Sequence, residues 1–222
     1  MRTNGCLTRS MAAAACALVA AGSASAAPAT WTDWASITSS GAVGTMGGVG
    51  VTATVNSGAI NGPTSQTACG FNYWTGNAYT NGSLSNAPTN CEQVSLNGAV
   101  SITVAFSSAV DNLYMALLSI GQPSLQVTYD FDQAVSIDSQ GTGAYGSGPG
   151  VPGAGDTLAM NEFHGVVRFS APVMSLTFTT SPAENWHAFT FGTAAIPEPG
   201  SLALVGVALL GAGALTRRRK AA

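Results

Sequence analysis

Several acidic residues and one histidine stand at spacings that place them on one face of an extended strand. Asp130 and Asp132 are two residues apart, as are Glu162 and His164, and residues i and i+2 of a β-strand point to the same side. Two carboxylates on one face, joined by Asp138 or by backbone carbonyls of a glycine-rich loop, predict a Ca²⁺ site, because this cation takes hard oxygen ligands. The alternative is a solvated polar strand face. A complete calcium-loop motif is absent from the sequence.

Glu162 and His164 have a second interpretation, in acid–base chemistry. A carboxylate beside an imidazole supports proton transfer near neutral pH, whereas the alternative is a strand-end pair that is hydrogen-bonded to the backbone. Glu162 and Glu184 are the candidates for the two carboxyl groups of a glycosidase. The sequence contains no GxSxG, HExxH or phosphate-loop motif. We therefore expect no catalytic activity.

Aromatic residues among asparagine and glycine indicate binding instead. The stretch FNYWTGNAYTNG carries Tyr73, Trp74 and Tyr79, whose rings would stack on sugars while amide side chains form hydrogen bonds. These three residues are the predicted glycan-binding set. Because Phe71 and Tyr73 alternate with Asn72 and Trp74, the alternative assigns one of the two faces to the core.

The cysteines fit an exported protein. Cys6 and Cys16 lie in the N-terminal segment, which leaves Cys69 and Cys91 for the domain. In an oxidising compartment these two form a disulfide, worth roughly 3 kcal/mol on the chain-entropy model. The alternative is two unpaired, buried thiols. The spacing offers no zinc site.

The elements that must position these residues are predicted to be β-strands. Apolar and polar residues alternate with period two in several stretches, which is typical of half-buried strands, and Leu113 to Ile120 is apolar on both faces, as in a central strand. Clusters of Gly, Asn, Pro and Ser separate the stretches, the longest from Ser139 to Asp156. We predict an all-β fold, an antiparallel β-sandwich of jelly-roll type. The alternating stretches contain Val49 to Val55, Val100 to Phe106, Leu125 to Phe131, Met174 to Phe178 and Trp186 to Phe191.

The ends of the 222-residue chain differ from this domain. Residues 1–26 carry Arg2 and Arg9, an apolar run and then Ala24-Ser25-Ala26. This is the layout of a helical signal peptide, which directs the protein to the Sec translocon and is cleaved after Ala26. Between residues 27 and 195 the only cation is Arg168, against nine carboxylates. Such a surface repels phosphate backbones, so nucleic-acid binding is excluded for this domain.

The segment 196–222 combines three features. Pro197, Glu198 and Pro199 precede an apolar run, and Arg217, Arg218, Arg219 and Lys220 follow it. The run has roughly 16 residues and as a helix spans about 24 Å, a short transmembrane helix. The four cations act as a stop-transfer signal on the cytoplasmic side.

The three features together resemble the PEP-CTERM sorting domain of Gram-negative bacteria, with Ile196 where Val is usual. The resemblance implies that exosortase is a partner, that the membrane is spanned transiently at the inner membrane, and that cleavage near Glu198 delivers the domain to the cell surface or outside the cell. The alternative is a permanent single-span anchor. We expect a structural or adhesive role in the exopolysaccharide matrix of a biofilm, with a lectin-like glycan-binding module and, less favoured, a glycosidase as alternatives.

Overall fold

The computed structural model describes residues 26–61 and 71–195, all within the compact unit Ser25–Pro197. Nearly all of the predicted signal peptide, Cys69, the sorting motif, the apolar run and the basic cluster lie outside the described residues. The signal helix and the transmembrane helix therefore stay predictions. Among the described residues no helix is long and apolar enough to span a membrane.

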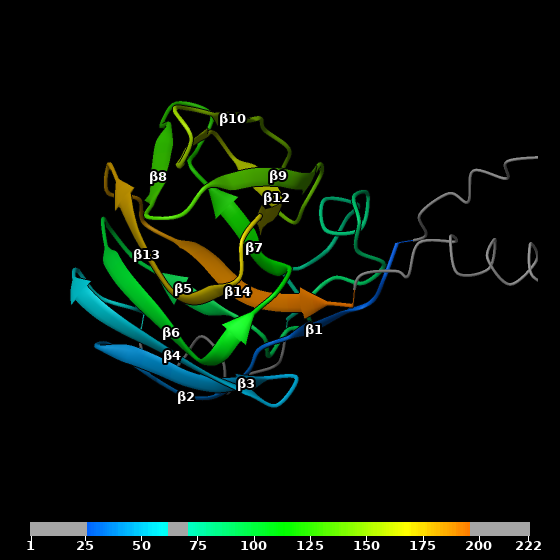
Figure 1. Ribbon diagram of the computed structural model, residues 1–222. Helices are drawn as coiled ribbons and strands as arrows, with labels where there is room; N and C mark the ends of the chain where they lie inside the picture. The colour runs from blue at the N-terminus through cyan, green and yellow to red at the C-terminus, as the bar shows by residue number, and fades with distance from the viewer. Residues whose placement is uncertain (1–25, 62–70, 196–222) are drawn as a thin grey trace, which may run out of the picture. The chain divides into compact units, whose positions relative to one another are not determined.

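The described residues form an all-β structure of antiparallel sheets, as predicted, in which most paired strands are distant in the sequence (Figure 1). The strands are β1 (Ala29–Trp31), β2 (Asp33–Thr38), β3 (Gly41–Met46), β4 (Val49–Ser57), β5 (Val94–Leu96), β6 (Ser101–Val110), β7 (Leu113–Ile120), β8 (Val127–Phe131), β9 (Val135–Gln140), β10 (Gly150–Pro152), β11 (Thr157–Met160), β12 (Phe163–Phe169), β13 (Val173–Ser181) and β14 (His187–Ala194).

These strands make two sheets. The first has the order β1-β14-β7-β12-β9, with β5 also paired to β14, and the second has the order β10-β11-β8-β13-β6-β4-β3-β2. From β6 to β9 and from β11 to β14, successive strands alternate between the sheets. This alternation is the pattern expected of a jelly roll.

One core fills the space between the two sheets. Side chains of both contribute to it, and ring contacts cross the interface: Phe106 meets Phe191, and Phe178 meets Phe189, with ring centroids 5.8 and 5.3 Å apart. These edge-on contacts add to the burial of the ring surfaces. The sheets thus pack face to face, as in a sandwich.

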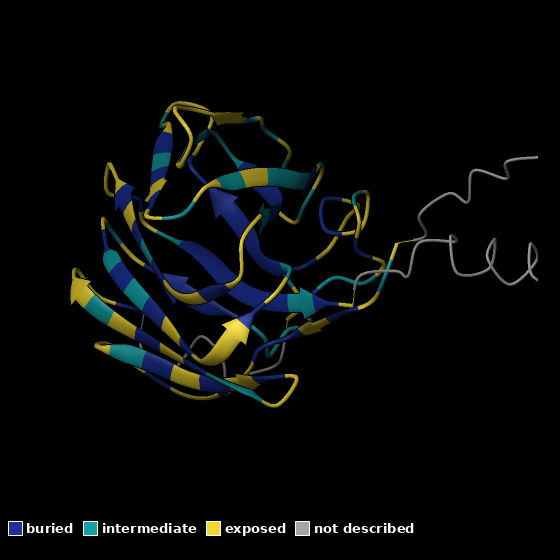
Figure 2. Cartoon of the chain, in the orientation of Figure 1, coloured by how far each residue is buried: buried dark blue, intermediate teal, exposed yellow. Residues whose placement is uncertain are grey.

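The first sheet is buried on both of its faces. Its second face carries Tyr114, Ala116 and Leu118, which pack in a separate cluster with Trp74 and Tyr79 from the segment 71–92. This segment, which contains no strand, therefore covers the first sheet as a third layer. All eight residues of β7 are consequently buried (Figure 2), which confirms the prediction of a central strand.

Two details of the strand prediction are wrong. Met174 was expected on the buried face with Leu176 and Phe178, but it is 55% exposed, because a register shift between Val173 and Ser175 turns it outward. The predicted loop from Ser139 to Asp156 contains strand β10, which pairs with β11.

Candidate functional site

A β-bulge in the first sheet orients the polar residues of the candidate site. Between the pairs Phe163 with Ile120 and Gly165 with Leu117, β7 has one residue more than β12. Ser119 and Glu162 both adopt positive φ, 53° and 49°, a region that non-glycine residues rarely occupy. Such strained positions and bulges gather at functional sites.

The bulge brings Ser119, Glu162 and His164 together with Tyr79. The Ser119 hydroxyl donates to Glu162 Oε1 at 2.9 Å, and this oxygen lies 3.7 Å from His164 Nε2. The Tyr79 hydroxyl and His164 Nδ1 are 3.0 Å apart. A ring proton on Nε2 would face the carboxylate and leave Nδ1 to accept from Tyr79, so this tautomer is favoured. We call these four residues the polar cluster.

Burial shifts the proton affinities of the polar cluster. Burial lowers the pKa of His164 to about 4, so its imidazole is neutral at pH 7. Burial also raises the pKa of Glu162, against the lowering effect of its hydrogen bond from Ser119, and the charge of Glu184 raises it further. The predicted proximity of Glu162 and His164 is confirmed, although Glu162 lies just before β12 rather than within it.

A glycine-rich turn lies directly on the polar cluster. The Gly143 N–H donates to the Gly146 carbonyl at 2.8 Å and closes the turn around Ala144 and Tyr145. A Cβ atom at Gly143 would collide with the His164 ring, and one at Gly146 would come within 3.2 Å of Glu162 Cγ. Only glycine at position 143 allows the backbone to come this close to the imidazole.

Beside this turn the molecule has an open cleft of about 290 Å³, lined by Phe71, Tyr73, Thr75, Ala144 and Tyr145. The Tyr73 ring stacks on that of Tyr145 at 5.8 Å and contacts that of Phe71 at 4.7 Å. Trp186, just before β14, supports both tyrosines at 5.4 and 5.7 Å. We call this the aromatic cleft. Its lining combines flat apolar rings with hydroxyl groups.

The aromatic cleft corrects the predicted glycan-binding set. Tyr73 lines it, but Trp74 and Tyr79 are only 2% and 0% exposed and pack in the core against the first sheet. The alternation of FNYW explains the difference, because Phe71 and Tyr73 point outward while Trp74 points inward. Sequence reasoning missed Tyr145, which stands in a glycine-rich loop without periodicity, and Trp186, which it placed in a strand.

Glu184 is a structural carboxylate. It is buried, and its Oε2 accepts hydrogen bonds from the Gly121 backbone N–H at 2.8 Å and from His187 Nδ1 at 3.0 Å. A sugar has no access to this carboxylate from solvent. The pairing of Glu162 with Glu184 in a glycosidase site is therefore disfavoured.

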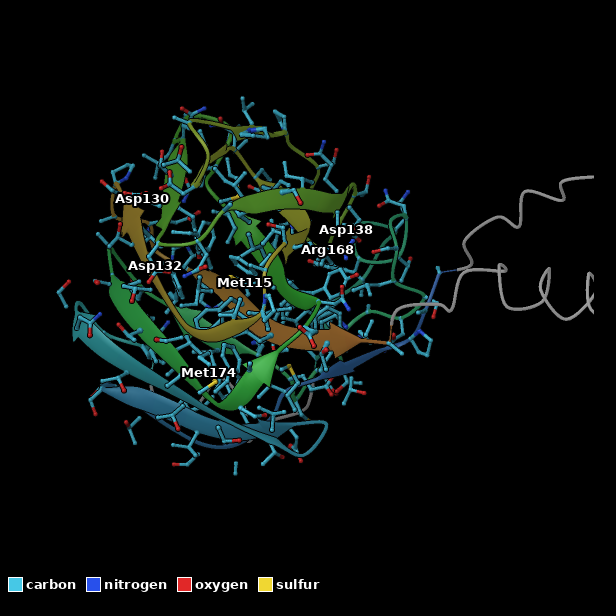
Figure 3. The ribbon with its side chains drawn as sticks, viewed as in Figure 1. Met115, Asp130, Asp132, Asp138, Arg168 and Met174 are labelled. Carbon is cyan, nitrogen blue, oxygen red and sulfur yellow. The ribbon has the colours of Figure 1, made fainter. Side chains whose placement is uncertain are left out.

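Asp138 does not join Asp130 and Asp132 as a third calcium ligand. Asp130 and Asp132 are exposed at the end of β8 in the second sheet, where Asp132 accepts from the Thr177 N–H at 2.9 Å. Asp138 lies on β9 in the first sheet, apart from them (Figure 3), and accepts from Ser83. In the described ranges no three acidic, histidine or cysteine residues gather as a metal site would require.

The disulfide stays a prediction. Cys91 is half-buried, in the segment between Trp74 and β5. Its expected partner, Cys69, is outside the described residues, so the geometry of this pair is not tested.

Comparisons with known proteins identify one segment. Residues 195–220 match the PEP-CTERM protein-sorting motif, whereas no curated protein and no solved structure matches the chain. The match includes Pro197, Glu198, Pro199 and the four cations, and it confirms the resemblance found in the sequence. The chain therefore carries a PEP-CTERM sorting motif and is an exported protein of the kind that exosortase sorts.

Proposed function

We propose that this exported domain is a non-catalytic, adhesive component of an exopolysaccharide matrix and that it binds polysaccharide through the aromatic cleft. Exosortase processing would release it from the inner membrane to the cell surface or the surrounding matrix. The sorting motif supports export, and the cleft supports the binding role.

The exposure of two cleft rings is the observation that carries the proposal. Among the described residues five large hydrophobic side chains are exposed, and the two aromatic ones are Phe71, 64% exposed, and Tyr145, 51% exposed. Both line the same cleft. Exposed aromatic rings that gather in one groove mark ligand-binding sites, and sugar rings offer apolar C–H faces that stack on such rings.

The polar cluster supports a binding role over a catalytic one. Ser119 donates to Glu162 rather than to His164, so it does not form the hydroxyl–imidazole pair of a Ser–His nucleophile. His164 is fully buried and neutral, behind Tyr145. In this arrangement the cluster holds the glycine-rich turn and the Tyr145 ring in place.

Affinity electrophoresis tests the binding role. The wild-type protein should migrate more slowly in gels that contain polysaccharide from the native matrix, and Tyr145→Ala should lose most of this retardation. Met174→Ala is the matched control, because Met174 is equally exposed but lies on the second sheet. Equal migration of all three proteins with and without polysaccharide would refute the proposal, and release of reducing sugar would refute its non-catalytic part.

A further inference from the structure

We infer that the aromatic cleft selects neutral glycan chains and rejects acidic ones. This inference rests on the proposed function and adds the chemical class of the ligand. The charges around the cleft support it.

The cleft itself offers no positive charge. Its lining consists of two tyrosines, a phenylalanine, a threonine and an alanine. Recognition of a uronate or sulfate group requires a cationic side chain or a cluster of aligned backbone donors. Ring stacking and hydroxyl hydrogen bonds, which this lining does provide, suit an uncharged sugar.

Arg168 is the one cation of the described residues, and it lies near the end of β12 that is away from the polar cluster. Arg168 donates to Asn112 Oδ1 at 2.7 Å, and its guanidinium lies 5.7 Å from the centre of the Tyr114 ring. Phe163, at the end of β12 that adjoins the polar cluster, is five residues away, or about 17 Å along an extended strand. Arg168 is therefore occupied by these partners and remote from the cleft.

A carboxylate instead lies behind the cleft. Glu162 packs against the turn that carries Tyr145, with its Cγ 3.2 Å from where a Cβ of Gly146 would be. Its charge is one of the causes that raise the pKa of the Tyr145 hydroxyl, after burial and the interactions with Tyr73. The described residues also carry nine carboxylates against one cation, so a polyanion would approach against the field of the whole domain.

Polymers that share a backbone but differ in charge provide the test. Hydroxyethylcellulose is compared with carboxymethylcellulose, which has the same cellulose backbone, in affinity gels at low and at physiological salt; galactomannan and polygalacturonate add a second neutral and a second acidic polymer, on different backbones. We expect the mature protein to bind a neutral polymer at least about tenfold more tightly than the acidic ones at low salt, where repulsion is least screened.

A charge-insertion variant keeps the test specific to the cleft. Ala144→Lys places a cation on the cleft lining, and we expect it to gain salt-sensitive binding to the acidic polymers. Ala154→Lys adds the same charge at an exposed position in the β10–β11 connection and should gain none.

The outcomes separate the two proposals. Preference for the neutral polymers with loss in Tyr145→Ala supports both. Equal or tighter binding of an acidic polymer by the wild-type protein, abolished in Tyr145→Ala, overturns the selectivity while the adhesive function stands. Failure to bind any polymer, including polysaccharide from the native matrix, overturns the proposed function and the selectivity with it.

Discussion

Tyr145 stacks on His164, with ring centroids 6.5 Å apart and planes inclined by 25°. One residue is half exposed in the aromatic cleft, and the other is fully buried in the polar cluster. The stack therefore connects the protonation of a buried imidazole to the position of a ring that we propose binds sugar. Because His164 is buried and supports the Tyr145 ring, its role can be tested by measuring the free energy of unfolding as well as sugar binding.

The first prediction concerns pH. We expect the free energy of unfolding to fall as pH is lowered from about 6.5 to about 4, because the unfolded chain binds a proton at His164 in this window and the folded chain does not. The loss is at most about 3.5 kcal/mol, since each pKa unit corresponds to about 1.4 kcal/mol. Urea unfolding at a series of pH values measures it.

His164→Gln is the matched variant for this pH prediction. The raised pKa of Glu162 acts in the opposite direction, because a folded carboxyl that holds its proton more tightly loses stability as pH rises. Without His164 the acid-side loss should therefore shrink or reverse. The assignment fails if wild type and variant have the same slope.

The second prediction concerns the close approach of the glycine-rich turn. Gly143→Ala should destabilise the fold by roughly 1–3 kcal/mol, because its methyl group would collide with the His164 ring and force the turn outward. Gly50→Ala is the control, since a Cβ there meets only Ser107 at an ordinary 3.5 Å. Thermal unfolding compares the two. Equal melting temperatures would show that the turn does not depend on this approach.

The third prediction concerns Glu184. Glu184→Gln should cost roughly 1–3 kcal/mol, because a neutral amide oxygen accepts hydrogen bonds from the Gly121 N–H and from His187 more weakly than a carboxylate oxygen does. Asp130→Asn, at an exposed strand position, should change stability by less than about 0.5 kcal/mol. Denaturant unfolding measures both. A stable Glu184→Gln protein would mean that this carboxylate is not structural.

The fold was predictable where the chain follows a simple period. β4 and β6 show alternation of apolar and polar residues, and β7 is apolar on both faces, so these strands and the sandwich could be inferred. The register shift that exposes Met174 has no sequence signal, because the three extra residues between the paired positions lie on the partner strand β6 and leave no mark on the pattern of β13. The alternation of apolar and polar residues therefore predicts the strands but not the register shifts within them.

The candidate site was predictable only in part, since it depends on contacts between distant segments. The spacing of Glu162 and His164 indicated a pair, but Ser119 and Tyr79 join it only through the bulge and through the segment that covers the first sheet. Tyr145 was missed because glycines on both sides leave no periodic pattern. Trp74 and Tyr79 were placed in a binding face because a loop that packs as a third layer has the composition of an exposed one.

The fourth prediction concerns processing. Ala29 pairs with Ala194 across β1 and β14, so the first and the last strand of the described domain meet in one strand pair. The Ala27 N–H already donates to the Ser83 carbonyl at 3.0 Å, and cleavage after Ala26 would leave the fold intact. In the extracellular fraction of the native host we expect an intact mass for a chain from Ala27 to near Pro197. A species that keeps Arg217 to Lys220 would make the tail a permanent anchor.

The position of the bound sugar tests the central claim most directly. In the isotope-labelled mature protein, titration with a neutral oligosaccharide should shift the backbone amide signals of Thr75, Ala144 and Tyr145 in a saturable way. Signals of β3 and β4, on the opposite sheet, should not move. Saturable shifts confined to β3 and β4, or no shifts with millimolar oligosaccharide from the native matrix, would contradict a glycan site in the aromatic cleft.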